Sequence, residues 1–142
     1  MARLHEYQGK EILATNGFKI PRGRAASTAD EAVAAAKELG GEVVIKIQAW
    51  TTGRAGIGGV AFAEKPNQVR AHAARMLTMK VGQFPVDTVL VEEKIAIERE
   101  FFLSFAIDDK RRSENTVVFL AHHLFASPNS VKFTNLVVYV RK

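Results

Sequence analysis

The sequence of 142 residues predicts an α+β domain, in which helices cover one face of a mostly antiparallel sheet. Three observations lead to this prediction. Stretches with helical spacing of apolar residues alternate with short apolar runs typical of strands, and the links between them are short. Hydrophobic residues make up 47% of the chain, which suits a packed core. We find no internal repeat and no low-complexity tract.

Three segments have the pattern of a helix: residues 4–15, 28–39 and 66–77. The first ends at Asn16-Gly17, although its apolar positions form no clean stripe. The second opens with a capping box, in which the Thr28 hydroxyl and the Glu31 carboxylate satisfy first-turn amides. The third begins at Pro66, a residue favoured at the first helical position.

Four apolar runs are predicted to be strands: residues 42–48, 59–63, 88–92 and 100–107. The stretch from Ile20 to Gly23 is predicted to be a turn or an extended connection. Residues 116–121 and 136–140 are two further candidate strands.

The composition argues against several classes of function. The chain has no cysteine, which excludes disulfides, thiol catalysis and cysteine-bound metals and fits the cytoplasm, the compartment we expect. No apolar run approaches the roughly 20 residues that cross a bilayer, so we expect no membrane attachment. The charged N-terminus does not resemble a secretory signal.

The formal charge of +5 suggests attraction to anions. The densest basic run, Lys110–Arg112, lies beside acidic residues and lacks interleaved aromatics, so a solvated turn is favoured over nucleic-acid binding. His122 and His123 would point to opposite faces of a strand, so we expect no metal site from the histidines. No catalytic nucleophile can be proposed from the spacing.

A lysine lies in the middle of the strand predicted over residues 42–48. Because side chains alternate along a strand, Lys46 and Gln48 share the face opposite the core. A buried lysine is very costly without an anionic partner, so this face must be solvated, paired with a carboxylate or turned toward a ligand. The glycine-rich loop 51–59 adds Arg54 and accessible amides, a combination that suits phosphate. An ordinary glycine-rich hairpin is the alternative.

Two carboxylates lie at the ends of neighbouring predicted strands. Glu92 directly follows an apolar run, where it could accept hydrogen bonds from the ribose or amino group of a nucleotide. Glu100 begins the next strand and shares a face with Phe102 and Ser104. Solvated strand ends are the alternative for both.

Together these stretches resemble the N-terminal part of the β subunit of ADP-forming succinate–CoA ligase, which begins with an ATP-grasp nucleotide-binding region. The matching stretches are Leu4-His5-Glu6-Tyr7-Gln8, Val44-Ile45-Lys46-Ile47-Gln48, Gly53-Arg54, Gly58-Gly59-Val60, Leu90-Val91-Glu92 and Glu100-Phe101-Phe102-Leu103. The likeness covers residues 1–108, which we predict to be an ATP-grasp-like nucleotide-binding region. Residues 109–142 are predicted to be a divergent C-terminal segment.

The resemblance implies that the complete ligase binds ATP or GTP with magnesium. It also implies phosphoryl transfer to a histidine of a partner α subunit, and then to the acid before CoA attacks. Carried over by position, it implies six nucleotide-binding residues: Lys46, Gly53, Arg54, Ala55, Glu92 and Glu100. Phosphoryl transfer depends mostly on positioning and charge stabilisation, and a charged set of this kind suits it.

The chain also departs from the family. The family loop usually reads Gly-Gly-Arg-Gly-Lys, whereas this chain has Thr52-Gly53-Arg54-Ala55-Gly56. The likeness ends near Asp109, and the family's magnesium ligands belong to a half that we expect to be missing here. We interpret the chain as a truncated or frame-altered product and expect no acyl-CoA formation by it alone. A non-catalytic basic α+β module that binds a protein or nucleic acid is the alternative.

Overall fold

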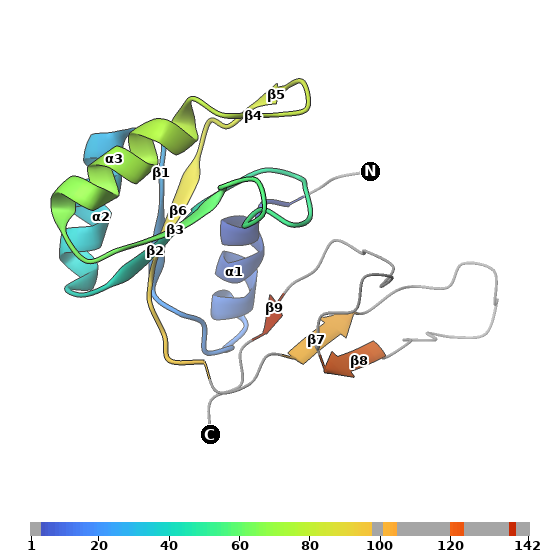
Figure 1. The fold of residues 1–142 in the computed structure, drawn as a ribbon. Coiled ribbons are helices and arrows are strands. Elements are labelled where there is room, and N and C mark those ends of the chain that lie inside the picture. Colours follow the sequence, from blue (N-terminus) through green and yellow to red (C-terminus); the bar gives the residue numbers. More distant parts are fainter. Residues whose placement is uncertain (1–3, 98–100, 105–119, 124–136, 139–142) are drawn as a thin grey trace. The chain divides into compact units, whose positions relative to one another are not determined.

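A computed structural model describes residues 4–97, 101–104, 120–123 and 137–138 (Figure 1). The chain forms two compact units, residues 1–95 and residues 96–142.

The first unit is built on a four-stranded antiparallel sheet. Its strands are β1 (Gly23–Ala26), β2 (Val43–Ile47), β3 (Val60–Ala63) and β6 (Val89–Glu93), in the spatial order β1-β6-β2-β3. Its helices are α1 (Glu6–Thr15), α2 (Ala29–Leu39) and α3 (Pro66–Leu77). A two-stranded hairpin, β4 (Lys80–Val81) and β5 (Phe84–Pro85), joins α3 to β6. The prediction of an α+β fold with an antiparallel sheet is confirmed.

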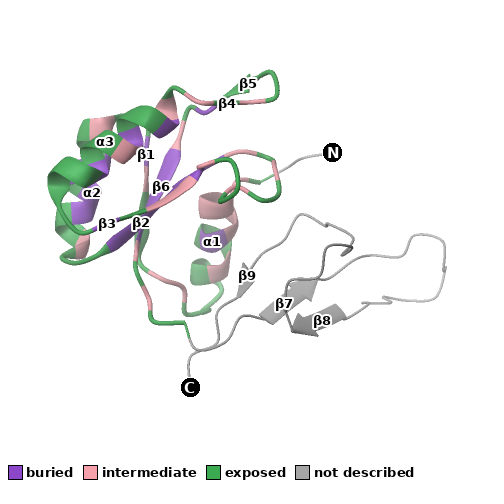
Figure 2. Cartoon of the chain, viewed as in Figure 1, coloured by how far each residue is buried: buried purple, intermediate pink, exposed green. Residues whose placement is uncertain are grey.

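One face of the sheet forms the apolar core. Val43, Ile45 and Ile47 of β2 point to this face with Val89 and Val91 of β6, and all five are almost completely buried. Helices α2 and α3 cover the face with small and apolar side chains, among them alanines of α2 and Val69, Ala73 and Met76 of α3 (Figure 2). The alternation read from the sequence therefore directs the odd-numbered residues of β2 into the core.

The ends of these helices follow the predicted local chemistry. The Thr28 hydroxyl accepts a hydrogen bond from the Glu31 amide at 3.2 Å, while the Glu31 carboxylate accepts one from the Ser27 amide at 2.7 Å. Gly40 closes α2 with a φ of 71°, a left-handed conformation that glycine adopts without steric cost. Pro66 occupies the first helical position of α3, as predicted.

Helix α1 differs from the predicted arrangement of helices on one face. Its residues Glu6 and Lys10 contact Lys46 of β2 and Glu92 of β6, whose side chains point away from the apolar core. Helix α1 therefore lies against the opposite face of the sheet (Figure 1). The missing apolar stripe now has a physical explanation, because charged side chains make the contact with the sheet.

Strand β1 and the β4–β5 hairpin differ from the prediction made from the sequence. Strand β1 occupies residues 23–26, where we predicted a turn or extended connection ending at Gly23, and it pairs antiparallel with β6. Its sequence, Gly-Arg-Ala-Ala, has little intrinsic preference for a strand, so the pairing with β6 determines its conformation. The short β4–β5 hairpin was also not predicted.

The second unit contains a three-stranded antiparallel sheet. Strand β7 (Phe101–Ser104) lies between β8 (Leu120–His123) and β9 (Val137–Val138). These strands overlap the predicted strand at 100–107 and the two candidate strands at 116–121 and 136–140. The predicted boundary between residues 108 and 109 stays a prediction.

Candidate functional site

The candidate site is built around Lys46 in the middle of β2. Every residue of this strand is buried, and Lys46 itself is only 9% exposed. It projects from the face opposite Ile45 and Ile47, where α1 lies. A buried ammonium needs compensating charge, so its partners decide what this face can do.

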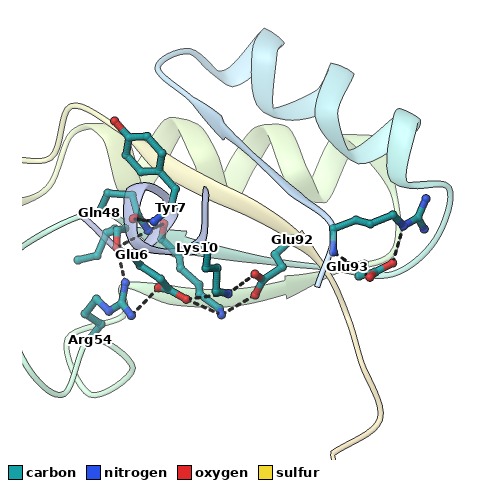
Figure 3. Close-up of polar contacts among 10 residues, drawn as sticks. Glu6, Tyr7, Lys10, Gln48, Arg54, Glu92 and Glu93 are labelled. Atoms are coloured by element: carbon teal, nitrogen blue, oxygen red, sulfur yellow. Dashed lines mark hydrogen bonds and ion pairs between the residues drawn. The ribbon is translucent and has the colours of Figure 1, made fainter. Parts of the chain in front are cut away.

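The first partner of Lys46 is Glu92 of β6, which is 2% exposed. The Lys46 Nζ lies 2.7 Å from Glu92 Oε2. The other carboxylate oxygen of Glu92 contacts the Nζ of Lys10 from α1 (Figure 3). One buried carboxylate on the sheet thus compensates two ammonium groups from different elements.

The second partner is Glu6, at the first position of α1. Its Oε1 lies 3.2 Å from Lys46 Nζ and 3.1 Å from Lys10 Nζ, while its Oε2 lies 2.7 Å from an Arg54 nitrogen. We call Glu6, Lys10, Lys46, Arg54 and Glu92 the charged network; Figure 3 labels all of them except Lys46. These five residues are three cations and two carboxylates.

These cations determine the protonation of Glu6. Burial on its own raises the pKa of this carboxyl, but the charges of Lys46, Lys10 and Arg54 outweigh it and lower the pKa from 4.5 to about 2. A hydrogen bond from Arg54 acts in the same direction. Glu6 is therefore anionic at neutral pH.

The loop after β2 is ordered around Arg54. One guanidinium nitrogen donates to the backbone oxygen of Ile47 at 3.0 Å, and another contacts Glu6. The Arg54 backbone oxygen accepts a hydrogen bond from the Gly59 amide at 2.7 Å. A Cβ on Gly59 would lie 2.6 Å from Ile47 Cδ1, so only glycine allows this close approach of the loop to the strand.

Polar and aromatic contacts attach α1 to the end of β2. The Gln48 side-chain oxygen accepts a hydrogen bond from the Tyr7 amide at 3.2 Å. The His5 ring, at the N-cap of α1, stacks on the half-exposed Trp50 with the ring centroids 4.7 Å apart. The start of α1 is thus fixed beside the glycine-rich loop.

The structure brings three of the six residues expected to bind nucleotide, Lys46, Arg54 and Glu92, into one network. Gly53, with a φ of 69°, and Ala55 lie in the loop on either side of Arg54. Glu100 lies outside the described residues. The nucleotide contacts implied for all six stay predictions.

Two members of the network, Glu6 and Lys10, were not expected as site residues. A signal was present, because they are four residues apart in a predicted helix and therefore share one face. Their partners on the sheet, Lys46 for Glu6 and Glu92 for Lys10, lie 40 and 82 positions further along the chain. Spacing within a helix could not indicate contacts of that range.

Within the described ranges, no group of three or more histidine and acidic side chains is arranged to hold a metal ion. The acidic members of the charged network are already bound to lysine and arginine, so they do not fit a magnesium site. Across the same ranges, no helix has the length and apolar character needed to span a membrane.

Comparison with known proteins identifies the fold and its family. Residues 3–123 match the family described as the ATP-grasp domain. The chain belongs to this family. A solved structure from Candidatus Korarchaeum cryptofilum, titled a dinucleotide-forming acetyl-coenzyme A synthetase, is similar to this protein with a TM-score of 0.66. The match covers 75% of this chain and 49% of the synthetase chain. Because the two sequences are only 23% identical, this likeness shows a shared fold alone.

Curated relatives give a more particular likeness, to the β subunit of ADP-forming succinate–CoA ligase. The subunit from Geobacter sulfurreducens is 43% identical over 112 residues, which are 74% of this chain and 29% of the relative. The subunit from Staphylothermus marinus is 39% identical over 122 residues, 86% of this chain and 31% of the relative. The chain thus spans under a third of the length of these relatives.

Proposed function

We propose that this chain binds the phosphates of ATP or GTP, as the nucleotide-binding portion of an acid–CoA ligase of the succinate–CoA ligase type. The observation that carries the proposal is the convergence of Lys46 and Arg54 on one anion. Both cations contact the carboxylate of Glu6, at 3.2 Å and 2.7 Å. The oxygens of a phosphate accept the same charge-assisted hydrogen bonds as a carboxylate. Two cations that contact one carboxylate are therefore placed to contact a phosphate as well.

The residues of the site would have different tasks. Lys46 supplies a point charge from a rigid strand, and Arg54 supplies a planar fork from the loop. Gly53 and Ala55 shape the loop that closes over the phosphates. Glu92 fixes the Lys46 ammonium from the neighbouring strand, and with Glu100 it would form the acidic side of the nucleotide site.

In the complete ligase, the nucleotide would phosphorylate a histidine of a partner α subunit, and an acyl phosphate would then react with CoA. The relatives named as β subunits support this wider assignment. Magnesium would neutralise phosphate charge when bound. The described residues do not fit a magnesium site, so the task that we assign to them is to hold and orient the phosphates. No observation favours the alternative of a non-catalytic module.

Calorimetry with ATP and ADP tests the proposal. We expect Lys46→Ala to weaken nucleotide binding by about 1–3 kcal/mol, the scale of a hydrogen bond to a charged group. Lys37→Ala is the matched control, because Lys37 is an exposed lysine on α2, which covers the other face of the sheet. Equal affinities in the wild type and Lys46→Ala would refute the phosphate role.

A further inference from the structure

We infer that Glu6 occupies the phosphate position of the site, so that nucleotide must displace the start of α1 before it can bind Lys46 and Arg54 together. This inference rests on the proposed function and concerns the regulation of the same site. In this view α1 is an internal competitor of the nucleotide.

The geometry of Glu6 supports the inference. Its carboxylate contacts Lys46 and Lys10 through one oxygen and Arg54 through the other, and so bridges the sheet and the glycine-rich loop. A phosphate group offers the same kind of contacts, because its oxygens also accept hydrogen bonds from ammonium and guanidinium groups. The two anions therefore compete for the same donors.

The balance of charge shows why the site does not hold the Glu6 carboxylate and a nucleotide phosphate together equally well. With Glu6 in place, the three cations of the charged network face two carboxylates. A nucleotide phosphate added beside Glu6 would meet a like charge in a partly buried site, where repulsion is screened less than in water. Replacing Glu6 by phosphate keeps every cation paired and removes that repulsion.

Helix α1 is attached in a way that permits this exchange. None of its residues belongs to the described apolar core, and Ile12 in its middle is 52% exposed. Its described contacts with the sheet and the segment after β2 include ion pairs of Glu6 and Lys10, a hydrogen bond from the Tyr7 amide and stacking of the His5 ring. A phosphate that takes over Lys46 and Arg54 removes the ion pairs of Glu6, so that only the Tyr7 and His5 contacts still attach the start of α1 to the segment after β2 in the described part of the chain.

Calorimetric titration of the full 142-residue chain with ATP tests the competition. We expect Glu6→Gln to bind ATP about 10-fold more tightly than the wild type or better, because the isosteric amide no longer competes as an anion. Glu11→Gln is the matched control, since it removes a charge from an exposed position on the same helix, and we expect no change in affinity. An affinity of Glu6→Gln equal to or lower than that of the wild type overturns the inference.

Hydrogen exchange on the wild-type chain provides a measurement that needs no variant. A released helix of ten residues is marginal in water, so we expect ATP to speed amide exchange in α1 while it slows exchange in β2. Protection of α1 by ATP would overturn the inference.

The two proposals fail in different ways. If Lys46→Ala weakens ATP binding while Glu6→Gln leaves it unchanged, the competitor role is wrong and the phosphate site stands. If neither the wild type nor Glu6→Gln binds ATP, the proposed function is wrong and the inference fails with it.

Discussion

The two faces of the sheet are made by the same strands but are held by different forces. On the face covered by α2 and α3, the alternate residues of β2 and β6 are valines and isoleucines in apolar contact. On the face covered by α1, the intervening positions include Lys46, Gln48 and Glu92, and the contacts with α1 are hydrogen bonds and ion pairs. One face is a core and the other carries the candidate site.

This difference shows how a single strand can serve both stability and the binding that we propose. Apolar packing is not directional, but any cavity in it lowers the free energy of unfolding. The core face therefore resists rearrangement. A buried ion pair is costly to break when one partner is removed, so a change of partner must keep the charges compensated. The site face can change partners on that condition, while the core face keeps Lys46 in position.

The largest effect is expected when the charged network loses its sheet carboxylate. Glu92→Ala removes one of the two carboxylates that contact the buried ammonium groups of Lys10 and Lys46, and should lower the free energy of unfolding by about 3–5 kcal/mol. Urea denaturation measures the change. The double variant Lys10→Met with Glu92→Leu should be more stable than Glu92→Ala, because one buried cation fewer then depends on the carboxylate of Glu6. A cost below about 1 kcal/mol, the scale of an exposed ion pair, would mean that water reaches these ammonium groups.

A cavity on the core face should be nearly as costly. Ile45 is 0% exposed, and Ile45→Ala should lower the free energy of unfolding by about 3 kcal/mol, within the range for large-to-small core substitutions. The milder Ile45→Val should cost about 1 kcal/mol. The comparison of the faces also predicts that folded Ile45→Val keeps the wild-type affinity for ATP. A large change in affinity would show that the two faces are not independent.

These differences explain what the sequence could and could not predict. Alternation along β2 and the residues that begin and end the helices are local signals, so the core, α2 and α3 could be predicted. Local spacing also placed Lys46 opposite the core. The partners Glu6 and Lys10 could not be found in this way, because the contact of α1 with the sheet depends on charge pairing between distant segments. Strand β1 was missed for a related reason, since its conformation depends on pairing with β6.

Acid should weaken the attachment of α1 before it affects the core. The pKa of Glu6 is lowered from 4.5 to about 2 in the folded protein, so its contribution to stability is present above pH 4.5 and is lost as the pH falls toward 2. The shift corresponds to roughly 3 kcal/mol. We expect the difference in free energy of unfolding between the wild type and Glu6→Gln to shrink over this pH window. A difference that does not vary with pH would contradict the charge-based attachment.

The smallest effect is expected from an ion pair that lies on the surface. Lys94 pairs with Glu42, and hydrogen bonding between them raises the pKa of Lys94 and lowers that of Glu42. Both side chains are about half exposed, so water and salt screen the pair. We expect Lys94→Ala to leave the urea midpoint of unfolding unchanged within error, at low and at high salt. A destabilisation as large as that of Glu92→Ala would show that burial does not explain the difference in strength between the charged network and a surface ion pair. The difference between the candidate site and the surface would then have to rest on the geometry of the contacts alone.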